Sequence, residues 1–120
     1  MNFLILTSGA SIALLFASTA EGRRTYRLGC LLSQPLDAPE NVAFFEELRR
    51  RGFIEGQNLT IEYRAYGLHA ELISQYAAEL VNAPVDVIVA NGDGAIRTLQ
   101  QTTKTIPILA IAVLDLLRAG

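Results

Sequence analysis

Apolar and polar residues form two kinds of pattern along this chain of 120 residues. In some segments apolar residues follow one another in short runs or alternate with polar ones, as in strands; in others they recur every three or four positions, as on one face of a helix. The first pattern predicts strands at residues 26–33, 58–66, 85–90 and 106–113. The second predicts helices at residues 40–51, 68–81 and 95–104.

The helical period also predicts which side chains face the core. In the first helix these are Val42, Phe45 and Leu48, with Phe44 beside them. In the second helix they are Leu68, Leu72, Tyr76 and Leu80, with Ile73 and Ala77 alongside, and in the third helix they are Ile96 and Leu99. Acidic residues open the first helix and arginines close it, which suits the helix dipole, and Gly52 follows as its stop.

Strands that alternate with helices predict an α/β fold in which right-handed crossovers connect parallel strands. The expected architecture has three layers, with helices on both faces of the sheet, and the four predicted strands in the order 2-1-3-4. Ligands of such sheets bind at the carboxyl ends of the strands, near the point where the strand order reverses. The candidate ligand-binding residues are therefore Ser33, Gln34, Asn91, Gly92, Asp93, Gly94 and Asp115.

Two interpretations of the loop at Asn91, Gly92, Asp93 and Gly94 stay open. The loop follows a buried strand and opens a helix, whose free N–H groups and positive dipole end suit an anionic ligand group. Asp93 is equally suited to cap the helix, and its carboxylate would repel a carboxylate ligand. Ser33 and Gln34 fit either a ligand-contacting loop or an ordinary polar loop.

The first twenty residues have the pattern of an export leader. No charge occurs from Phe3 to Ala20, and Ser18 and Ala20 occupy the −3 and −1 positions of a cleavage site before Glu21. A basic residue before the apolar run is missing, so an uncleaved anchor and a mis-set start remain alternatives. We expect a leader at residues 1–20, a domain at residues 21–120, and a periplasmic or otherwise exported protein.

Composition excludes several classes of function. The net charge of −2 and the pI near 5.3 argue against a nucleic-acid partner, which usually needs a basic patch. With one cysteine, Cys30, and one histidine, His69, the chain has neither an intrachain disulfide nor a Cys/His zinc site. Paired carboxylates, a phosphate-binding lysine loop and a nucleophile elbow do not occur. We therefore predict a protein that is not an enzyme, has no cofactor, and buries Cys30 in a strand.

Several blocks in order resemble one family of periplasmic solute-binding proteins, those grouped with tryptophan importers. Residues 52–64, GFIEGQNLTIEYR, resemble its G-[YF]-x-E-G-x-N turn and the strand that ends in E-[YW]-R. LISQYAAEL at residues 72–80 resembles a helix of that family, L-P-x-L-A-A-E-L. The segment from VDVIVA to TIPILAIAV, residues 85–113, resembles the family's next strand, helix and strand. The likeness covers residues 26–115.

The resemblance implies half of a type I periplasmic binding fold, in which two lobes close on a ligand. It implies a solute-binding component of an ABC importer, with an amino-acid-like organic solute and an ABC permease as partners. Asp115 matches the Asp of a D-P pair in that family, with Leu116 in place of the proline. Residues 21–120 correspond to an incomplete first lobe, so we expect a truncated fragment that binds little or nothing by itself.

Two other interpretations belong to different classes. One is a small flavodoxin-like or nucleotide-handling domain that uses residues 91–94 for phosphate. The other is a non-functional gene remnant whose fourth strand lies at an uncovered sheet edge, where exposed hydrophobic groups favour aggregation.

Overall fold

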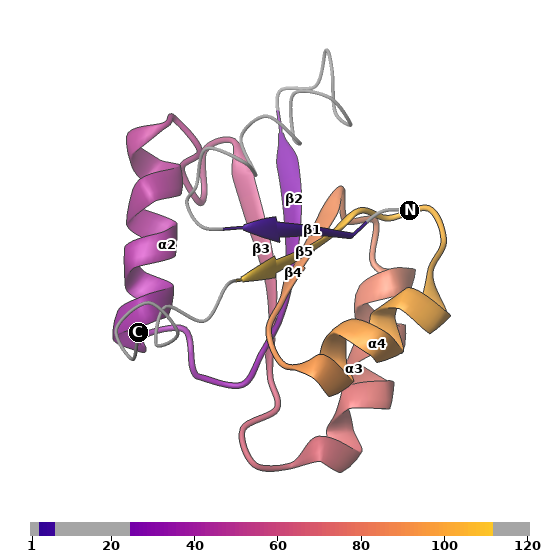
Figure 1. Cartoon of the computed structure of the whole chain (residues 1–120). Helices are drawn as coiled ribbons and strands as arrows, with labels where there is room; N and C mark the ends of the chain where they lie inside the picture. Colours follow the sequence, from indigo (N-terminus) through magenta and orange to yellow (C-terminus); the bar gives the residue numbers. More distant parts are fainter. Residues whose placement is uncertain (1–2, 7–24, 112–120) are drawn as a thin grey trace.

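A computed structural model describes residues 3–6 and 25–111 of the chain (Figure 1). The strands are β1 (Phe3–Leu6), β2 (Tyr26–Leu32), β3 (Leu59–Ala65), β4 (Val87–Ala90) and β5 (Ile108–Ile111). The helices are α2 (Pro39–Arg50), the 3₁₀ turn η1 (Ala70–Leu72), α3 (Ile73–Asn82) and α4 (Asp93–Thr102). Each strand and helix predicted from the sequence is present, with boundaries that differ by a few residues.

All strands of the sheet are parallel and follow the order β1-β5-β4-β2-β3. Read from β3, the four predicted strands have the expected order 2-1-3-4, which confirms the fold class. The sheet has one strand more than predicted, because Phe3–Leu6 pairs with Ile108–Ile111. In the described structure β5 therefore does not lie at an uncovered edge, contrary to one expectation above. Residues 7–20 of the predicted leader lie outside the described residues.

The core has two halves because side chains of a strand point alternately to opposite faces of the sheet. Leu28, Cys30 and Leu32 of β2 face α2, together with apolar residues of β4 and β5. Leu31 faces the opposite side, where α3 and α4 cover the sheet. Figure 1 shows α2 on one side of the sheet and α3 with α4 on the other, which gives the three layers predicted.

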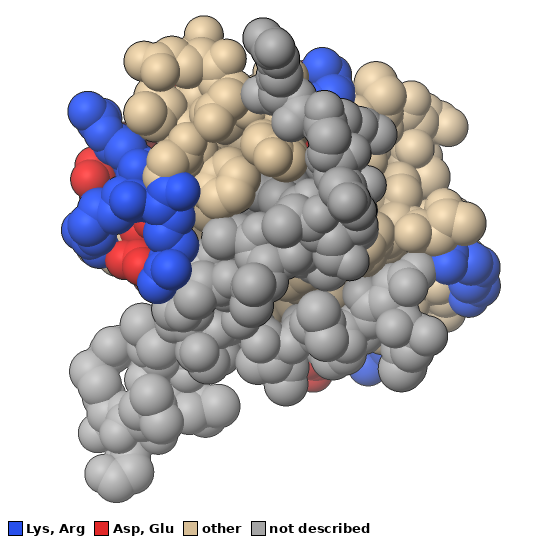
Figure 2. Space-filling model, turned by 90° about the horizontal axis from the view of Figure 1, so that it is seen from above, with Lys and Arg blue, Asp and Glu red and all other residues tan. Residues whose placement is uncertain are grey.

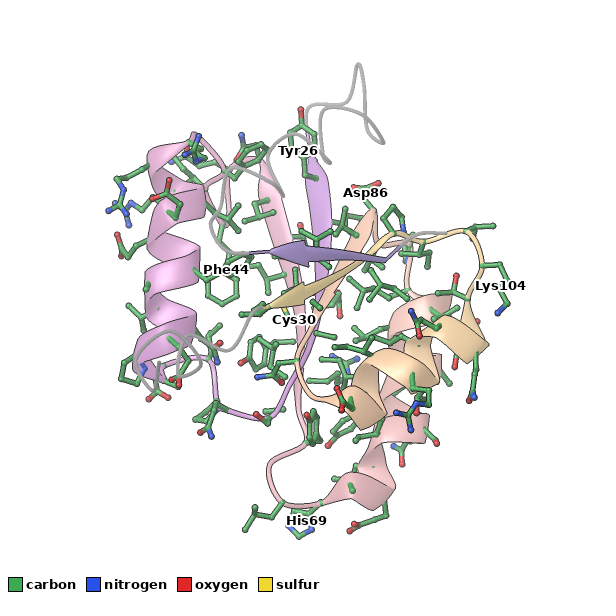
Figure 3. All side chains as sticks on the ribbon, in the orientation of Figure 1. Tyr26, Cys30, Phe44, His69, Asp86 and Lys104 are labelled. Atoms are coloured by element: carbon green, nitrogen blue, oxygen red, sulfur yellow. The ribbon has the colours of Figure 1, made fainter. Side chains whose placement is uncertain are left out.

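The inward face of α2 differs from the prediction. Phe44 and Leu48 are buried, and Figure 3 shows Phe44 pointing from α2 towards the sheet. Val42, expected in the core, is 44% exposed, and Phe45 is half-buried. The face is rotated because Asn41 is buried, with its side chain held by the loop before the helix.

The second predicted helix begins later than expected. Leu68, placed in the core by its spacing, is fully exposed. The helical segment starts at Ala70 as a 3₁₀ turn and becomes α-helical at Ile73, so Ile73, Ala77 and Leu80 are its buried residues. Gly67, with φ +58°, turns the chain after β3 and separates Leu68 from the helix.

The end of α2 is charged on its outer side. Figure 2 shows basic and acidic side chains gathered over this end of the molecule. Glu47 forms ion pairs with Arg50 at 2.7 Å and with Arg51 at 2.8 Å, and the Arg50 hydrogen bond is the main cause of its lowered pKa. Gly52 follows the helix with φ +95°, as the stop predicted for it.

Cys30 is expected to resist thiol reagents as long as the chain is folded. Its side chain is fully buried in the middle of β2, as predicted, and burial raises the pKa of the thiol, with a smaller contribution from the charge of Glu55. Because the thiolate is the reactive form, labelling with an aromatic disulfide reagent should be at least ~100-fold slower in the native chain than in denaturant. Equal labelling rates would show that β2 is not protected. The chain has no second cysteine to obscure the signal.

Candidate functional site

The carboxyl ends of three parallel strands lie together at one edge of the sheet, the lower edge in Figure 1. β2 is the middle strand of the three, with β3 on one side and β4 on the other. The chain leaves these strands at Ser33, Tyr66 and Asn91, so these residues begin three neighbouring loops. At β2 the strand order reverses, which is where open α/β sheets bind ligands.

Hydrogen bonds join the three loops. The Asn91 side-chain oxygen accepts a hydrogen bond from the Ser33 N–H at 2.9 Å. The Tyr66 hydroxyl donates to the Asn91 carbonyl, also at 2.9 Å. The backbone N–H of Tyr66 donates to the carbonyl of Leu32 at 3.0 Å. Ser33, Tyr66 and Asn91, hereafter the edge cluster, are therefore held in fixed positions relative to one another.

Tyr66 keeps its proton at ordinary pH. Burial raises the pKa of its hydroxyl, and a hydrogen bond with the Ser33 side chain offsets part of that rise. The neutral hydroxyl is the donor that the Asn91 carbonyl requires. The edge cluster thus consists of neutral donors and acceptors, which suits recognition of a polar solute better than proton transfer.

Gly92 connects the edge cluster to α4. It occupies the N-cap position with φ +88°, and an added Cβ would lie 2.4 Å from the Tyr66 hydroxyl oxygen. Only glycine permits both this backbone conformation and this close approach. Asp93 is the first residue of the helix and makes no capping hydrogen bond. The N-cap residue is therefore Gly92, and the interpretation of Asp93 as the cap is wrong. Asp93 is exposed and adds negative charge where the helix dipole is positive.

A second group of hydrogen bonds fixes the loop after β2. The Tyr63 hydroxyl donates to the Gln34 carbonyl at 2.6 Å. The Asn41 side-chain amide donates to the Pro35 carbonyl at 2.8 Å and to the Tyr63 hydroxyl oxygen at 2.9 Å. Asn41 is only 2% exposed, so its amide is committed to these contacts. Gln34 is thereby positioned through its backbone, and its side chain is left exposed.

The structure brings some of the predicted site residues together and leaves others apart. Ser33, Asn91 and Gly92 meet around Tyr66. Gln34 belongs to the neighbouring group at Tyr63, and Asp93 and Gly94 begin α4. Asp115 lies outside the described residues.

Sequence reasoning missed Tyr63, Tyr66 and Asn41. Tyr66 could have been found, because it ends the second predicted strand and the rule that selected Ser33 and Asn91 applies equally to it. Asn41 and Tyr63 gave no such signal, since their contacts depend on the path of the loop between β2 and α2.

Two features are absent from the described residues, a group of metal-ligating side chains and a helix of membrane-spanning character. Within residues 3–6 and 25–111 no three His, Cys, Asp or Glu side chains are grouped as a metal site requires. None of the helices in these ranges has both the length and the apolar character of a membrane span.

Two solved structures resemble the fold. One is a substrate-binding protein with adhesive properties from Clostridium difficile, in its ligand-free, open state; it has a TM-score of 0.65 and 22% identity over 77% of this chain. The other is an ABC domain in complex with L-Trp from Streptococcus pneumonia, with a TM-score of 0.61 and 16% identity over 75% of this chain. The chain therefore has a periplasmic-binding-like α/β fold.

The chain matches only part of these structures, covering 32% of the length of each. No protein-family model matches the sequence. No curated protein matches it either.

Proposed function

We propose that this chain is part of a solute-binding protein of an ABC importer and that the edge cluster contributes one wall of the ligand site. The observation that supports this most is the position of Ser33, Tyr66 and Asn91, joined by hydrogen bonds where the strand order reverses. The substrate-binding neighbours and the family resemblance of residues 26–115 point the same way. Export and an ABC permease partner are parts of the same proposal.

The chemistry at the carboxyl ends of the strands favours a small zwitterionic solute such as an amino acid. The first N–H groups of α4 have no partner within the helix and suit a carboxylate. The exposed carboxylate of Asp93 lies at the same helix end and suits an ammonium group. The carboxylate of an amino acid would meet these N–H groups and its ammonium group would meet Asp93, so the ammonium group offsets the repulsion that Asp93 exerts on a carboxylate. One of the neighbours in fold was solved with L-Trp.

A single wall is expected to bind such a solute weakly. Well-formed ligand sites bury about 70–90% of a ligand, and the carboxyl ends of the strands of one sheet cannot surround a ligand to that extent. We expect dissociation constants of about 1 mM or weaker, close to the lower limit of useful affinity. Titration calorimetry of the full chain with L-Trp should therefore show no heat beyond dilution.

Amide chemical shifts of the isotope-labelled full chain provide the decisive measurement. Titration with L-Trp and other amino acids should shift the amides of Ser33, Tyr66, Asn91 and Gly92 first. Asn91→Ala removes the acceptor for the Ser33 N–H and should abolish this response, whereas the matched control Asn82→Ala, at the exposed end of α3, should preserve it.

Two results contradict the proposal. One is the absence of shifts at the edge cluster with any amino acid at about 10 mM, well above the expected dissociation constants. The other is a response to FMN or nucleotide in place of amino acids, which would favour a flavodoxin-like domain. Micromolar affinity for an amino acid would leave the site in place and refute the expectation of a weak fragment.

A further inference from the structure

The outer side of β3 is one of the two free edges of the sheet in the described part of the chain, the other being that of β1. Two backbone hydrogen bonds show which residues of β3 direct their N–H and C=O groups to β2. The Tyr26 N–H donates to the Asn58 carbonyl, and the Tyr66 N–H donates to the Leu32 carbonyl. Alternate residues of a strand bond to the same neighbour. The backbone N–H and C=O groups of the even-numbered residues of β3 therefore point to β2. Those of the odd-numbered residues point outwards, to the free side of the strand.

The outward backbone groups divide into two sets. Those of Leu59 are used by the preceding turn, since the Leu59 carbonyl accepts a hydrogen bond from the Gly56 N–H at 3.1 Å. Ile61, Tyr63 and Ala65 follow, and no described residue outside β3 supplies a backbone partner for their outward N–H and C=O groups. The Tyr63 carbonyl accepts a hydrogen bond from the Arg64 guanidinium at 3.1 Å, and an added strand would replace this side-chain donor. Three alternate residues can therefore pair with an added strand.

Charged side chains occupy one face of this edge strand. Glu62 and Arg64 both point to the α3 side, where Arg64 Nε lies 2.7 Å from a carboxylate oxygen of Glu79. Glu62 lies 3.6 Å from Arg27 and 3.8 Å from Arg64. All these side chains are partly exposed. An added strand would therefore place its own side chains directly opposite one acidic and one basic residue.

We propose that the outer edge of β3 pairs antiparallel with the same edge of a second copy of this chain, about a two-fold axis at Tyr63. In this register Glu62 of each copy lies opposite Arg64 of the other, which gives two cross-strand pairs of opposite charge. Tyr63 lies opposite its own counterpart as a hydrogen-bonded pair, and Ile61 lies opposite Ala65. All three outward-facing residues of each copy are then bonded.

The charges select this register over its neighbours. Moving the axis to residue 62 places Glu62 opposite Glu62, and moving it to residue 64 places Arg64 opposite Arg64. Like charges directly opposite destabilise a strand pair. Moving the axis to residue 61 brings in Leu59, whose outward groups the turn already uses. An isologous interface centred on Tyr63 is the register that combines complementary charge with backbone groups that the turn before β3 does not use.

Apolar surface flanks the same edge. A groove of about 460 Å³ runs between α2 and β3, and its lining includes Leu36, Val42 and Ile61. Leu36 is 46% exposed and Val42 is 44% exposed, and Leu68, just beyond the end of β3, is fully exposed. These are the large apolar side chains that the described residues leave open to solvent. A second copy on the β3 edge would cover part of this surface.

Sedimentation equilibrium of the full chain between about 10 and 500 µM tests the proposal, because this range spans moderate self-association. The mass is expected to rise towards that of a dimer. Glu62→Arg and Arg64→Glu each replace two opposite-charge contacts by two like-charge contacts and should weaken association about 10- to 30-fold. An equimolar mixture of the two variants restores both pairs and should recover the dimer as a heterodimer.

Two controls keep the result specific. Arg97→Glu reverses an exposed charge on α4 and should leave association unchanged. Each variant loses partly exposed ion pairs, which contribute little to stability, and gains like-charge contacts with the former partners in its own chain, so thermal unfolding verifies that it folds. A chain that stays monomeric over the whole concentration range overturns the proposal. This holds even if the edge of β3 binds an extended peptide in place of a second copy. So does a dimer that neither variant weakens, or a mixture that fails to re-associate.

Discussion

Replacing Gly92 by alanine is expected to destabilise the fold by about 2–4 kcal/mol and to remove the edge-cluster response to amino acids. Gly92 has φ +88° and ψ 133°, a conformation that costs a residue with a side chain about 1–3 kcal/mol. Its new Cβ would also lie 2.4 Å from the Tyr66 hydroxyl oxygen, so Tyr66 must move and its hydrogen bond to the Asn91 carbonyl is lost. Urea denaturation measures the first effect and amide shifts measure the second.

Two further variants separate the causes of this loss. Gly56 has φ +89°, and an added Cβ there meets nothing within 4 Å, so Gly56→Ala reports the effect of a positive φ without a clash. Tyr66→Phe removes the oxygen that the new Cβ would strike. The double variant Gly92→Ala/Tyr66→Phe should therefore cost less than the sum of its single changes. Equal costs for Gly92→Ala and Gly56→Ala would show that the contact with Tyr66 has no role.

The sheet could be predicted from sequence because its signals are local. Each of the four predicted strands is a short apolar run or an alternation of apolar and polar residues, and parallel crossovers leave few possible strand orders. β1 was missed because the same uncharged, apolar residues also fit an export leader, and composition does not distinguish the two. Pairing between β1 and β5 is a contact between distant parts of the chain, which no local pattern encodes.

The helix faces show where periodicity fails. Spacing placed Val42 in the core, but α2 turns its Asn41 and Phe44 side inwards. An inward asparagine looks unfavourable in a hydrophobicity pattern, although its amide is satisfied by the Pro35 carbonyl and the Tyr63 hydroxyl. Hydrogen bonds of this kind depend on a loop conformation and so become visible only in three dimensions.

The site was predicted to the extent that it follows from topology. Ser33 and Asn91 directly follow neighbouring strands, and the structure joins them by a hydrogen bond. Their roles in ligand binding remain predictions, as do those of Gln34, Asp93 and Gly94. What topology cannot give is the contact through Tyr66, because it requires Gly92 to lie against the tyrosine hydroxyl.

Leu80→Ala is expected to lower the free energy of unfolding by about 3–5 kcal/mol, the upper part of the range for buried leucines. Leu80 is fully buried where α3 packs on β2, directly over Gly29. A Cβ on Gly29 would lie 3.4 Å from a Leu80 methyl carbon and 3.2 Å from Ile88, so the leucine fills space that the glycine leaves open. Because Gly29 has no side chain to relax into the void, the cavity should persist. Urea denaturation measures the loss, provided that the unfolding free energies of the variant and the original chain depend on urea concentration with the same slope.

Leu68→Ala is the matched control, since the same truncation at a fully exposed leucine should change stability by no more than about 0.5 kcal/mol. Gly29→Ala tests the cavity itself. Alone it should destabilise, because the methyl group is crowded at 3.2 Å by Ile88. Combined with Leu80→Ala, the same methyl partly fills the space left by the leucine, so the double variant should lose less than the two single variants together. A loss below about 1 kcal/mol for Leu80→Ala would mean that α3 does not pack on Gly29 as described, because no buried leucine with a persistent cavity costs so little.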